Sequence, residues 1–328
     1  MKKILSLVMA VLLVCGICFS LASCGASADF TVGVAQLAPH PALDAASQGF
    51  MDALTEELAK EGKTVKFVEQ NAGGEISACP SIIGSFVANG YDLILANATP
   101  VLQAAKSATS TIPILGTSVT EYGVALGIEN FNGTVGTNIS GTSDLAPLTE
   151  QAQMMIDTLG LKSGDKVGLL YCSAEANSAY QVAVVKAYLT GKSITCAEYA
   201  FADSNDLSAV ASKAANECKA IYVPTDNTVA DNTGIIKNIC MAKKIPVFAG
   251  EEGICATCGY ATLSIDYYNL GRKTGEMAAK ILLGKAHIED MAIEYDANPT
   301  KKYNKEICDA LGINTATLEA AGYVAISK

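Results

Sequence analysis

The sequence predicts an α/β protein with two doubly wound, parallel-sheet lobes and a ligand cleft between them. Three observations carry this prediction. The length of 328 residues allows about two domains of ordinary size. Short apolar runs of strand type alternate with longer segments of helical periodicity. This alternation occurs twice, on either side of the glycine-rich segment 123–143.

The N-terminal segment predicts where the protein works. Lys2 and Lys3 precede the apolar run 4–13, and Leu21-Ala-Ser-Cys24 follows. The segment resembles a bacterial lipoprotein leader, which implies that residues 1–23 are a signal peptide, that Cys24 is lipidated and that 24–29 form a linker. We therefore expect an extracytoplasmic protein anchored to the cell membrane. The alternative is an uncleaved transmembrane anchor.

The first series of elements reads β-α-β-α-β-α-β. Helix 99–108 begins at Thr99-Pro100, a typical helix start. The helix after the first strand carries apolar side chains at spacings of three and four, namely Leu43, Ala46, Phe50, Leu54 and Leu58. A further helix is expected over 76–88. Strands are expected over 30–37, 64–69, 91–96 and 112–116.

The second series repeats this architecture. Helices are expected over 145–161, 176–189, 207–218 and 229–242. Strands are expected over 166–171, 193–199, 220–223 and 245–248. The chain then continues with a strand over 260–265, a helix over 267–283, a short strand over 291–295 and a short helix over 303–311. We therefore assign 30–143 plus 267–288 to an N-terminal lobe, and 144–266 plus 289–328 to a C-terminal lobe.

The segment from Ile221 to Thr228 is the centre of the functional prediction. Pro224 stops a strand, and Asp226 and Asn227 follow before the next helix. In open α/β sheets, ligands bind beyond the carboxyl ends of the strands. The alternative is that Asp226 or Asn227 only caps the helix.

Small polar groups follow other strands in both halves. Hydroxyl and N–H groups at helix starts stabilise a carboxylate, whereas Asp226, or as the weaker candidate Glu175, pairs with an ammonium group. The set therefore matches a zwitterion. The candidate ligand-binding residues are Gln36, Thr99, Ser118, Ser173, Glu175, Ser178, Asp226 and Asn227.

Four motifs resemble a known family. They are Ala98-Thr-Pro-Val-Leu-Gln103, Tyr171-Cys-Ser-Ala-Glu-Ala-Asn-Ser178, Val223-Pro-Thr-Asp-Asn-Thr228 and Ser264-Ile-Asp-Tyr-Tyr-Asn-Leu-Gly271. From about Thr31 to Ile313 the chain is similar to ABC-importer substrate-binding proteins of the tryptophan/tyrosine type.

The resemblance implies a type I periplasmic-binding-protein fold and delivery of an amino acid to a permease and ATPase. It also implies ligand contacts at Thr99, Ser173, Ser178, Asp226 and Asn227, with Gln36 a weaker match. The chain departs from the family at Thr120-Glu-Tyr122, where relatives have Thr-Asp-Pro. Tyr122 then either floors an apolar pocket or covers the lobe edge.

Composition and missing motifs argue against other functions. The formal charge is −10, and Arg272 is the only arginine, so neither nucleic acid nor a phosphate clamp is supported. Phosphate-loop, nucleophile-elbow and metalloprotease motifs are absent from the sequence, and we predict no enzymatic activity, no cofactor and no metal. His40 lies at the first strand's end, where it either has a structural role or lies beside the ligand.

Two alternative functions remain open at this level. A sugar or nucleoside receptor would share the architecture, although such sites usually use aromatic stacking and the chain has no Trp. An extracytoplasmic thiol enzyme would use Cys255 and Cys258, which otherwise are core residues or a local disulfide. Glu251 and Glu252 either reach the cleft or lie in a solvated loop, and the second is expected.

Overall fold

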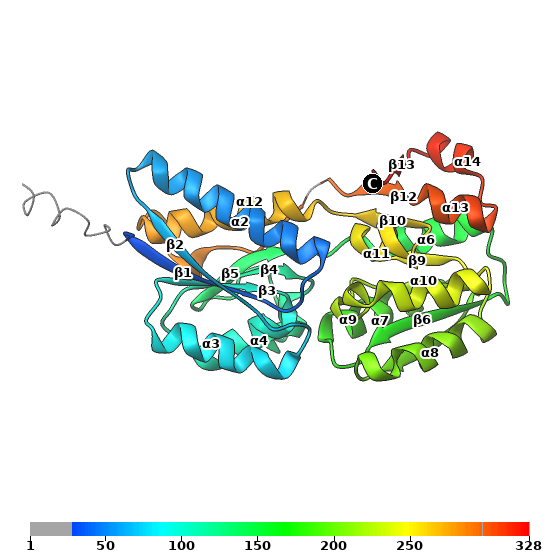
Figure 1. Cartoon of the computed structure of the whole chain (residues 1–328), viewed down its shortest axis with the longest axis horizontal. Coiled ribbons are helices and arrows are strands. Elements are labelled where there is room, and N and C mark those ends of the chain that lie inside the picture. Colours follow the sequence, from blue (N-terminus) through cyan, green and yellow to red (C-terminus); the bar gives the residue numbers. More distant parts are fainter. Residues whose placement is uncertain (1–27, 297, 328) are drawn as a thin grey trace, which may run out of the picture.

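Two sheets, each with helices on both faces, make up the protein, and they lie side by side in the computed structural model (Figure 1). The structure describes residues 28–296 and 298–327. The prediction of two α/β lobes is confirmed. We call the lobe that begins with β1 the first lobe and the other the second lobe.

The first lobe contains a six-stranded sheet whose paired strands are all parallel. In spatial order its strands are β11 (Glu294–Tyr295), β5 (Ile139–Ser143), β4 (Ile114–Val119), β3 (Leu93–Asn97), β1 (Phe30–Gln36) and β2 (Val65–Asn71). Its helices are α2 (Pro41–Lys60), η1 (Ile76–Ala78), α3 (Cys79–Ala88), α4 (Thr99–Ala108), α5 (Tyr122–Leu126), α12 (Tyr267–Leu282) and η2 (Ile288–Asp290).

The second lobe contains a seven-stranded sheet in which β12 runs antiparallel to β10. In spatial order its strands are β13 (Val324–Ala325), β12 (Thr300–Tyr303), β10 (Ala261–Ser264), β9 (Val247–Ala249), β8 (Ala220–Val223), β6 (Lys166–Cys172) and β7 (Thr195–Phe201). Its helices are α6 (Leu148–Leu159), α7 (Ala176–Gly191), α8 (Ser204–Glu217), α9 (Asn227–Asp231), α10 (Thr233–Ala242), α11 (Glu252–Thr257), α13 (Lys305–Leu311) and α14 (Thr315–Ala320).

Apolar cores fill both faces of each sheet. In the first lobe, α2 and α12 lie on one side of the sheet and α3 and α4 on the other (Figure 1). Phe50 and Met277 pack with Leu95 on the first side, whereas Phe86 and Leu102 belong to the core on the opposite side. The helical spacing of these apolar residues explains why each helix buries one stripe.

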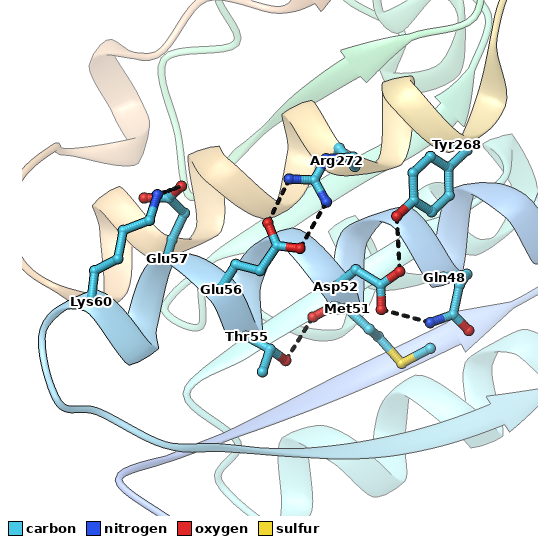
Figure 2. A network of polar contacts seen from close by, with 9 residues as sticks. All are labelled: Gln48, Met51, Asp52, Thr55, Glu56, Glu57, Lys60, Tyr268 and Arg272. Atoms are coloured by element: carbon cyan, nitrogen blue, oxygen red, sulfur yellow. Dashed lines mark hydrogen bonds and ion pairs between the residues drawn. The ribbon is translucent and has the colours of Figure 1, made fainter.

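The packing of α2 on α12 depends on glycines at the contact. A Cβ atom at Gly271 would lie 2.0 Å from the backbone oxygen of Ala46, and one at Gly49 would lie 2.1 Å from that of Tyr268. A glycine at each position therefore lets the two backbones approach closely. Figure 2 shows the polar contacts on the exposed side of this pair, where Arg272 donates to both carboxylate oxygens of Glu56 and Tyr268 donates to Asp52.

The chain passes between the lobes three times, after β5, after β10 and after β11. The last passage lies later than expected. We assigned residues 289–328 to the C-terminal lobe, but β11 pairs with β5 of the first sheet. The chain therefore returns to the second lobe between Tyr295 and Thr300.

Some elements differ from the sequence-based expectation. We did not predict β5, α5, α11, α14 or β13. The predicted helix 229–242 is broken at Asn232 into α9 and α10. The predicted helix 303–311 begins only at Lys305, because residues 300–303 pair with β10 as strand β12.

Candidate functional site

The space between the lobes is bounded by residues that follow strands of both sheets. A cavity of about 260 Å³ lies there, just below the range of roughly 300–1,000 Å³ typical of small-molecule sites. Residues after β1 and β2 line it from the first lobe, and residues at the ends of β6, β7 and β8 line it from the second. The lining residues are Leu37, Ala38, Gly73, Gly74, Glu75, Ile76, Ser77, Cys172, Ala174, Ala202, Asp203, Ser204, Asn227, Thr228, Asp231 and Asn232.

Glu175 organises the second-lobe side of this space. Its carboxylate is fully buried and accepts hydrogen bonds from the backbone N–H and side-chain amide of Asn227, at 3.1 and 2.6 Å. It also accepts from the backbone N–H and hydroxyl of Thr228, at 2.9 and 2.8 Å. Because these donors belong to the start of α9, Glu175 holds the end of β6 against that helix.

Asp226 is the N-cap residue of α9 and lies beside Glu175. Its Oδ1 accepts from the Val229 N–H at 2.9 Å, and its Oδ2 accepts from the Cys172 N–H at 2.7 Å. Burial, followed by the negative charge of Glu175, raises the pKa of Asp226 well above its usual range, and a hydrogen bond from Ser178 opposes that shift. Asp226 therefore does cap α9, as the alternative interpretation expected. Its carboxylate is also buried, and a nearby cation would stabilise the ionised form.

The first-lobe side presents hydroxyl groups that have no protein partner. Thr99 Oγ1 and Ser118 Oγ are buried without a hydrogen bond among the described residues. Thr99 follows β3, and Ser118 is the second-last residue of β4. These two strands are neighbours in the sheet, with Asn97 opposite Thr117. Buried hydroxyls are normally satisfied, so these two are available to a ligand.

The backbone is strained next to Thr99 and at Ser118. Ala98, directly before Thr99, has φ 101° and ψ 154°, a conformation that is essentially restricted to glycine. Ser118 has φ 53°, in the left-handed region. Non-glycine residues persist in such conformations where the surrounding structure imposes them, and they concentrate at ligand sites.

Two predicted ligand-binding residues have partners in their own lobes. Gln36 donates to Ala38 O at 2.8 Å and to Asp44 Oδ1 at 2.6 Å, and it accepts from Ser47 Oγ at 2.7 Å. Ser173 is exposed and donates to Phe201 O at 3.1 Å. Of the eight predicted residues, only Asn227 lines the cavity described above.

The set of candidate ligand-binding residues leaves out two buried acidic residues, Asp144 and Glu251. Asp144, which follows β5, is buried, accepts from the Tyr267 hydroxyl at 3.0 Å and leaves Oδ1 without a partner. Burial raises its pKa. We missed Asp144 because β5 was not predicted, so the rule that ligand groups follow strands was never applied there.

Glu251 is the second of these residues, and the sequence analysis considered it for the cleft but preferred a solvated loop. We expected a solvated loop at Glu251, which is wrong: Glu251 is 2% exposed and caps α11. Burial raises its pKa to about 7, with smaller contributions from Glu252 and Asp144. Its position two residues after β9 was the sequence signal for a role in the site.

Tyr122 was expected either to floor an apolar pocket or to cover the lobe edge. The structure shows neither, because Tyr122 is 1% exposed and packs in the first-lobe core.

Buried carboxyl groups therefore dominate the electrostatics of this region. Four of them, Asp144, Glu175, Asp226 and Glu251, are at most 3% exposed. No ion pair among the described residues includes any of the four. A buried carboxylate without a cationic partner is costly, so the arrangement favours a positively charged ligand group.

Comparison with known proteins identifies the family. The model of the family described as ABC transporter substrate binding protein matches residues 31–321. This chain belongs to that family. A curated relative, the tyrosine-binding protein of Clostridioides difficile strain R20291, is 35% identical over 258 residues, which cover 78% of this chain and 73% of the relative. The predicted resemblance is thereby confirmed.

Solved structures of substrate-binding proteins show the same fold. A Streptococcus pneumonia ABC domain in complex with L-Trp is 31% identical, with TM-score 0.81, and the match covers 90% of this chain and all of that one. A ligand-free, open substrate-binding protein with adhesive properties from Clostridium difficile is 34% identical, with TM-score 0.67 and coverage of 91% and 100%.

The remaining predictions have mixed outcomes. The leader and Cys24 lie outside the described residues. Within the described part of the chain, no helix is long and apolar enough to cross a membrane. Both Cys255 and Cys258 are buried free thiols, and burial raises the pKa of each. This environment is the opposite of what a reactive thiolate requires.

Proposed function

We propose that this substrate-binding protein captures one amino acid with an aromatic or other apolar side chain and delivers it to the permease and ATPase of an importer. Its lobes close on the ligand, and the permease recognises the closed form. No bond in the ligand is broken. The lipid on Cys24 keeps the receptor at the outer face of the membrane and so raises its concentration near the permease.

The observation that carries the proposal is the difference between the two sides of the cleft. The first lobe offers the unpartnered hydroxyls of Thr99 and Ser118 at the ends of adjacent strands. The second lobe offers the buried carboxylate of Asp226. Hydroxyl donors match the carboxylate of a free amino acid, and a buried carboxylate matches its ammonium group. A sugar or nucleoside has no ammonium group to compensate this charge.

The relatives support an aromatic ligand. One relative is a tyrosine-binding protein, and another was solved in complex with L-Trp. The thiol-enzyme alternative receives no support, since Cys255 and Cys258 are buried in a second-lobe core.

A panel of amino acids, sugars and nucleosides tests the proposal by thermal unfolding of the purified protein. We expect tyrosine, tryptophan or another apolar amino acid to raise the melting temperature. A ligand at 100 times its dissociation constant stabilises the folded state by about 2.7 kcal/mol. Stabilisation by a sugar or nucleoside, with none by any amino acid, would contradict the proposal.

Amino acid binding is expected to release protons near neutral pH. Burial raises the pKa of Asp226 to about 7, so we expect part of the ligand-free protein to carry a proton on this group near neutral pH. An ammonium group beside Asp226 favours the carboxylate and lowers that pKa, so the complex holds fewer protons. Affinity should therefore rise with pH from the lower pKa of the complex to the raised pKa of the free protein, and level off above it.

Calorimetric titration in buffers of different ionisation enthalpy measures this release. The binding heat should depend on the buffer near pH 7, and the dependence should be weaker in Asp226→Asn. Binding heats that are the same in every buffer between about pH 6 and pH 7 would contradict the protonation of Asp226 in the free protein.

A further inference from the structure

A second cavity lies within the second lobe and shares no lining residue with the cavity between the lobes. Its volume is about 320 Å³, within the range of roughly 300–1,000 Å³ typical of small-molecule sites. Its walls come from α6, from β12 and from the C-terminal segment 313–323, which are distant in the sequence. The lining residues are Met154, Asp157, Thr158, Lys301, Ile313, Asn314, Thr317, Leu318, Ala321 and Tyr323.

Apolar side chains make up much of the cavity wall. Met154 is 7% exposed and Leu318 is 3% exposed, and both belong to a core of the second lobe. Ile313 packs against the same core, and Ala321 adds a further apolar group to the wall. Such a wall stabilises a ligand with an apolar body, because apolar surface gains free energy when it leaves water.

Tyr323 brings a hydroxyl group to this cavity. The residue is 5% exposed and lines the cavity, yet its hydroxyl makes no hydrogen bond among the described residues. A buried tyrosine usually finds a partner for this group. Burial, followed by the negative charge of Asp157, raises the pKa of Tyr323, so the hydroxyl keeps its hydrogen and can donate it.

Lys301 brings a positive charge to the same wall. Its Nζ lies 5.7 Å from the centre of the Tyr323 ring. The side chain is half-buried and belongs to no ion pair among the described residues. Because this ammonium group has no carboxylate beside it, an anionic group of a ligand would supply the missing counter-charge.

Asp157 carries the opposite charge in the cavity wall, so the two charges have to be weighed. Its side chain is exposed, and its Oδ1 already accepts from Gln153 Nε2 at 2.7 Å. Water screens an exposed carboxylate, so leaving Asp157 without a cation costs little. The half-buried Lys301 gains more from a counter-charge, and the balance favours a ligand with a negative group.

We propose that this cavity is a second ligand site, which binds a small apolar carboxylic acid. The ligand's carboxylate accepts from Lys301 Nζ and from the Tyr323 hydroxyl. Its apolar body lies on Met154 and Leu318. This ligand needs no ammonium group and therefore differs from the amino acid proposed for the cleft.

Methyl NMR of the unmodified protein, with its methionine methyl groups labelled, tests the proposal. The probes are hydrocinnamate, phenylpropanol and phenylpropylamine, which share one apolar body and differ in charge. The Met154 methyl resonance, assigned by comparison with Met154→Leu, should move on titration with hydrocinnamate. The acid should bind roughly 3-fold to 30-fold more tightly than the alcohol or the amine, as expected for a charge-assisted contact at a half-buried position.

Lys301→Met should remove this preference, because it deletes the ammonium group and keeps an unbranched side chain. Lys305→Met is the matched control, since Lys305 is exposed in the same lobe, pairs with Asp309 and does not line the cavity. It should retain the preference for the acid. Thermal unfolding of both variants checks that the fold is kept.

Three results would overturn the proposal. A Met154 methyl resonance that no probe moves would show that the cavity takes no ligand of this kind. Equal or tighter binding of the alcohol or the amine would show that Lys301 does not select the charge. The same preference for the acid in Lys301→Met as in the unmodified protein would remove Lys301 from the site. The amino acid receptor function stands in all three cases, because its own ligands test it in the cleft.

Discussion

Asp226→Asn should reduce the affinity for the amino acid ligand by roughly 30-fold to 1,000-fold, as expected when one partner of a buried charge pair is removed. The substitution preserves the size of the side chain but removes the negative charge. No ion pair among the described residues compensates that charge. Once the charge is gone, the ligand's ammonium group is buried without its counter-charge.

The fold should survive this substitution. Asparagine is a good N-cap residue, so α9 can still begin at position 227. The single oxygen of asparagine retains one of the two N–H groups, those of Cys172 and Val229, that the carboxylate now accepts. Losing the other costs about 1–3 kcal/mol, which is partly offset because a buried charge is removed.

Titration calorimetry and thermal unfolding of the same sample measure these two effects. Asp206→Asn is a suitable control, because it removes the same charge from an exposed position of the same lobe. Its affinity should match that of the unmodified protein. Unchanged affinity in Asp226→Asn would exclude Asp226 as the partner of the ammonium group.

Gly271→Ala should destabilise the first lobe by roughly 1–3 kcal/mol or more, the usual cost of overpacking a core. The new Cβ would lie 2.0 Å from the oxygen and 2.7 Å from the carbonyl carbon of Ala46. These are backbone atoms of α2, so the clash is relieved only if α2 and α12 move apart. This cost exceeds the gain of about 1 kcal/mol in helix propensity.

Gly84→Ala provides the contrast for this second substitution. Gly84 lies within α3, and a Cβ atom there would meet no atom within 4 Å. The propensity gain is then unopposed, so Gly84→Ala should stabilise the protein by roughly 0.5–1 kcal/mol. Urea unfolding of both variants gives the comparison. A Gly271→Ala protein as stable as the parent would show that α2 and α12 do not need this close approach.

Local signals predicted part of the fold at the level of single residues. Helix 99–108 and strand 220–223 have the predicted bounds, because Pro100 favours a helix start and Pro224 cannot continue a strand. Strand β5 was missed because Ile139 is its only large apolar residue. Its extended conformation depends on pairing with β4 and β11, whose residues lie elsewhere in the sequence.

The candidate site, like the fold, was predicted only in part from local signals. The pattern of strand ends predicted that Glu175, Ser178, Asp226 and Asn227 would lie together. In the structure Asn227 donates hydrogen bonds to Glu175, and Ser178 donates one to Asp226. Their contact with a ligand stays a prediction. Gln36 was chosen by the same pattern, but its hydrogen bonds are made within the first lobe.

The sequence by itself determined the fold class, the family and the polar character of the strand ends, because these follow from periodicity, turn residues and short motifs within a few positions of one another. Only the tertiary structure decided that Asp144 and Glu251 are buried and that His40 meets Asn227 across the lobes. Burial and long-range hydrogen bonds depend on which distant segments are brought together, and those contacts set the charge, tautomer and pKa of each group.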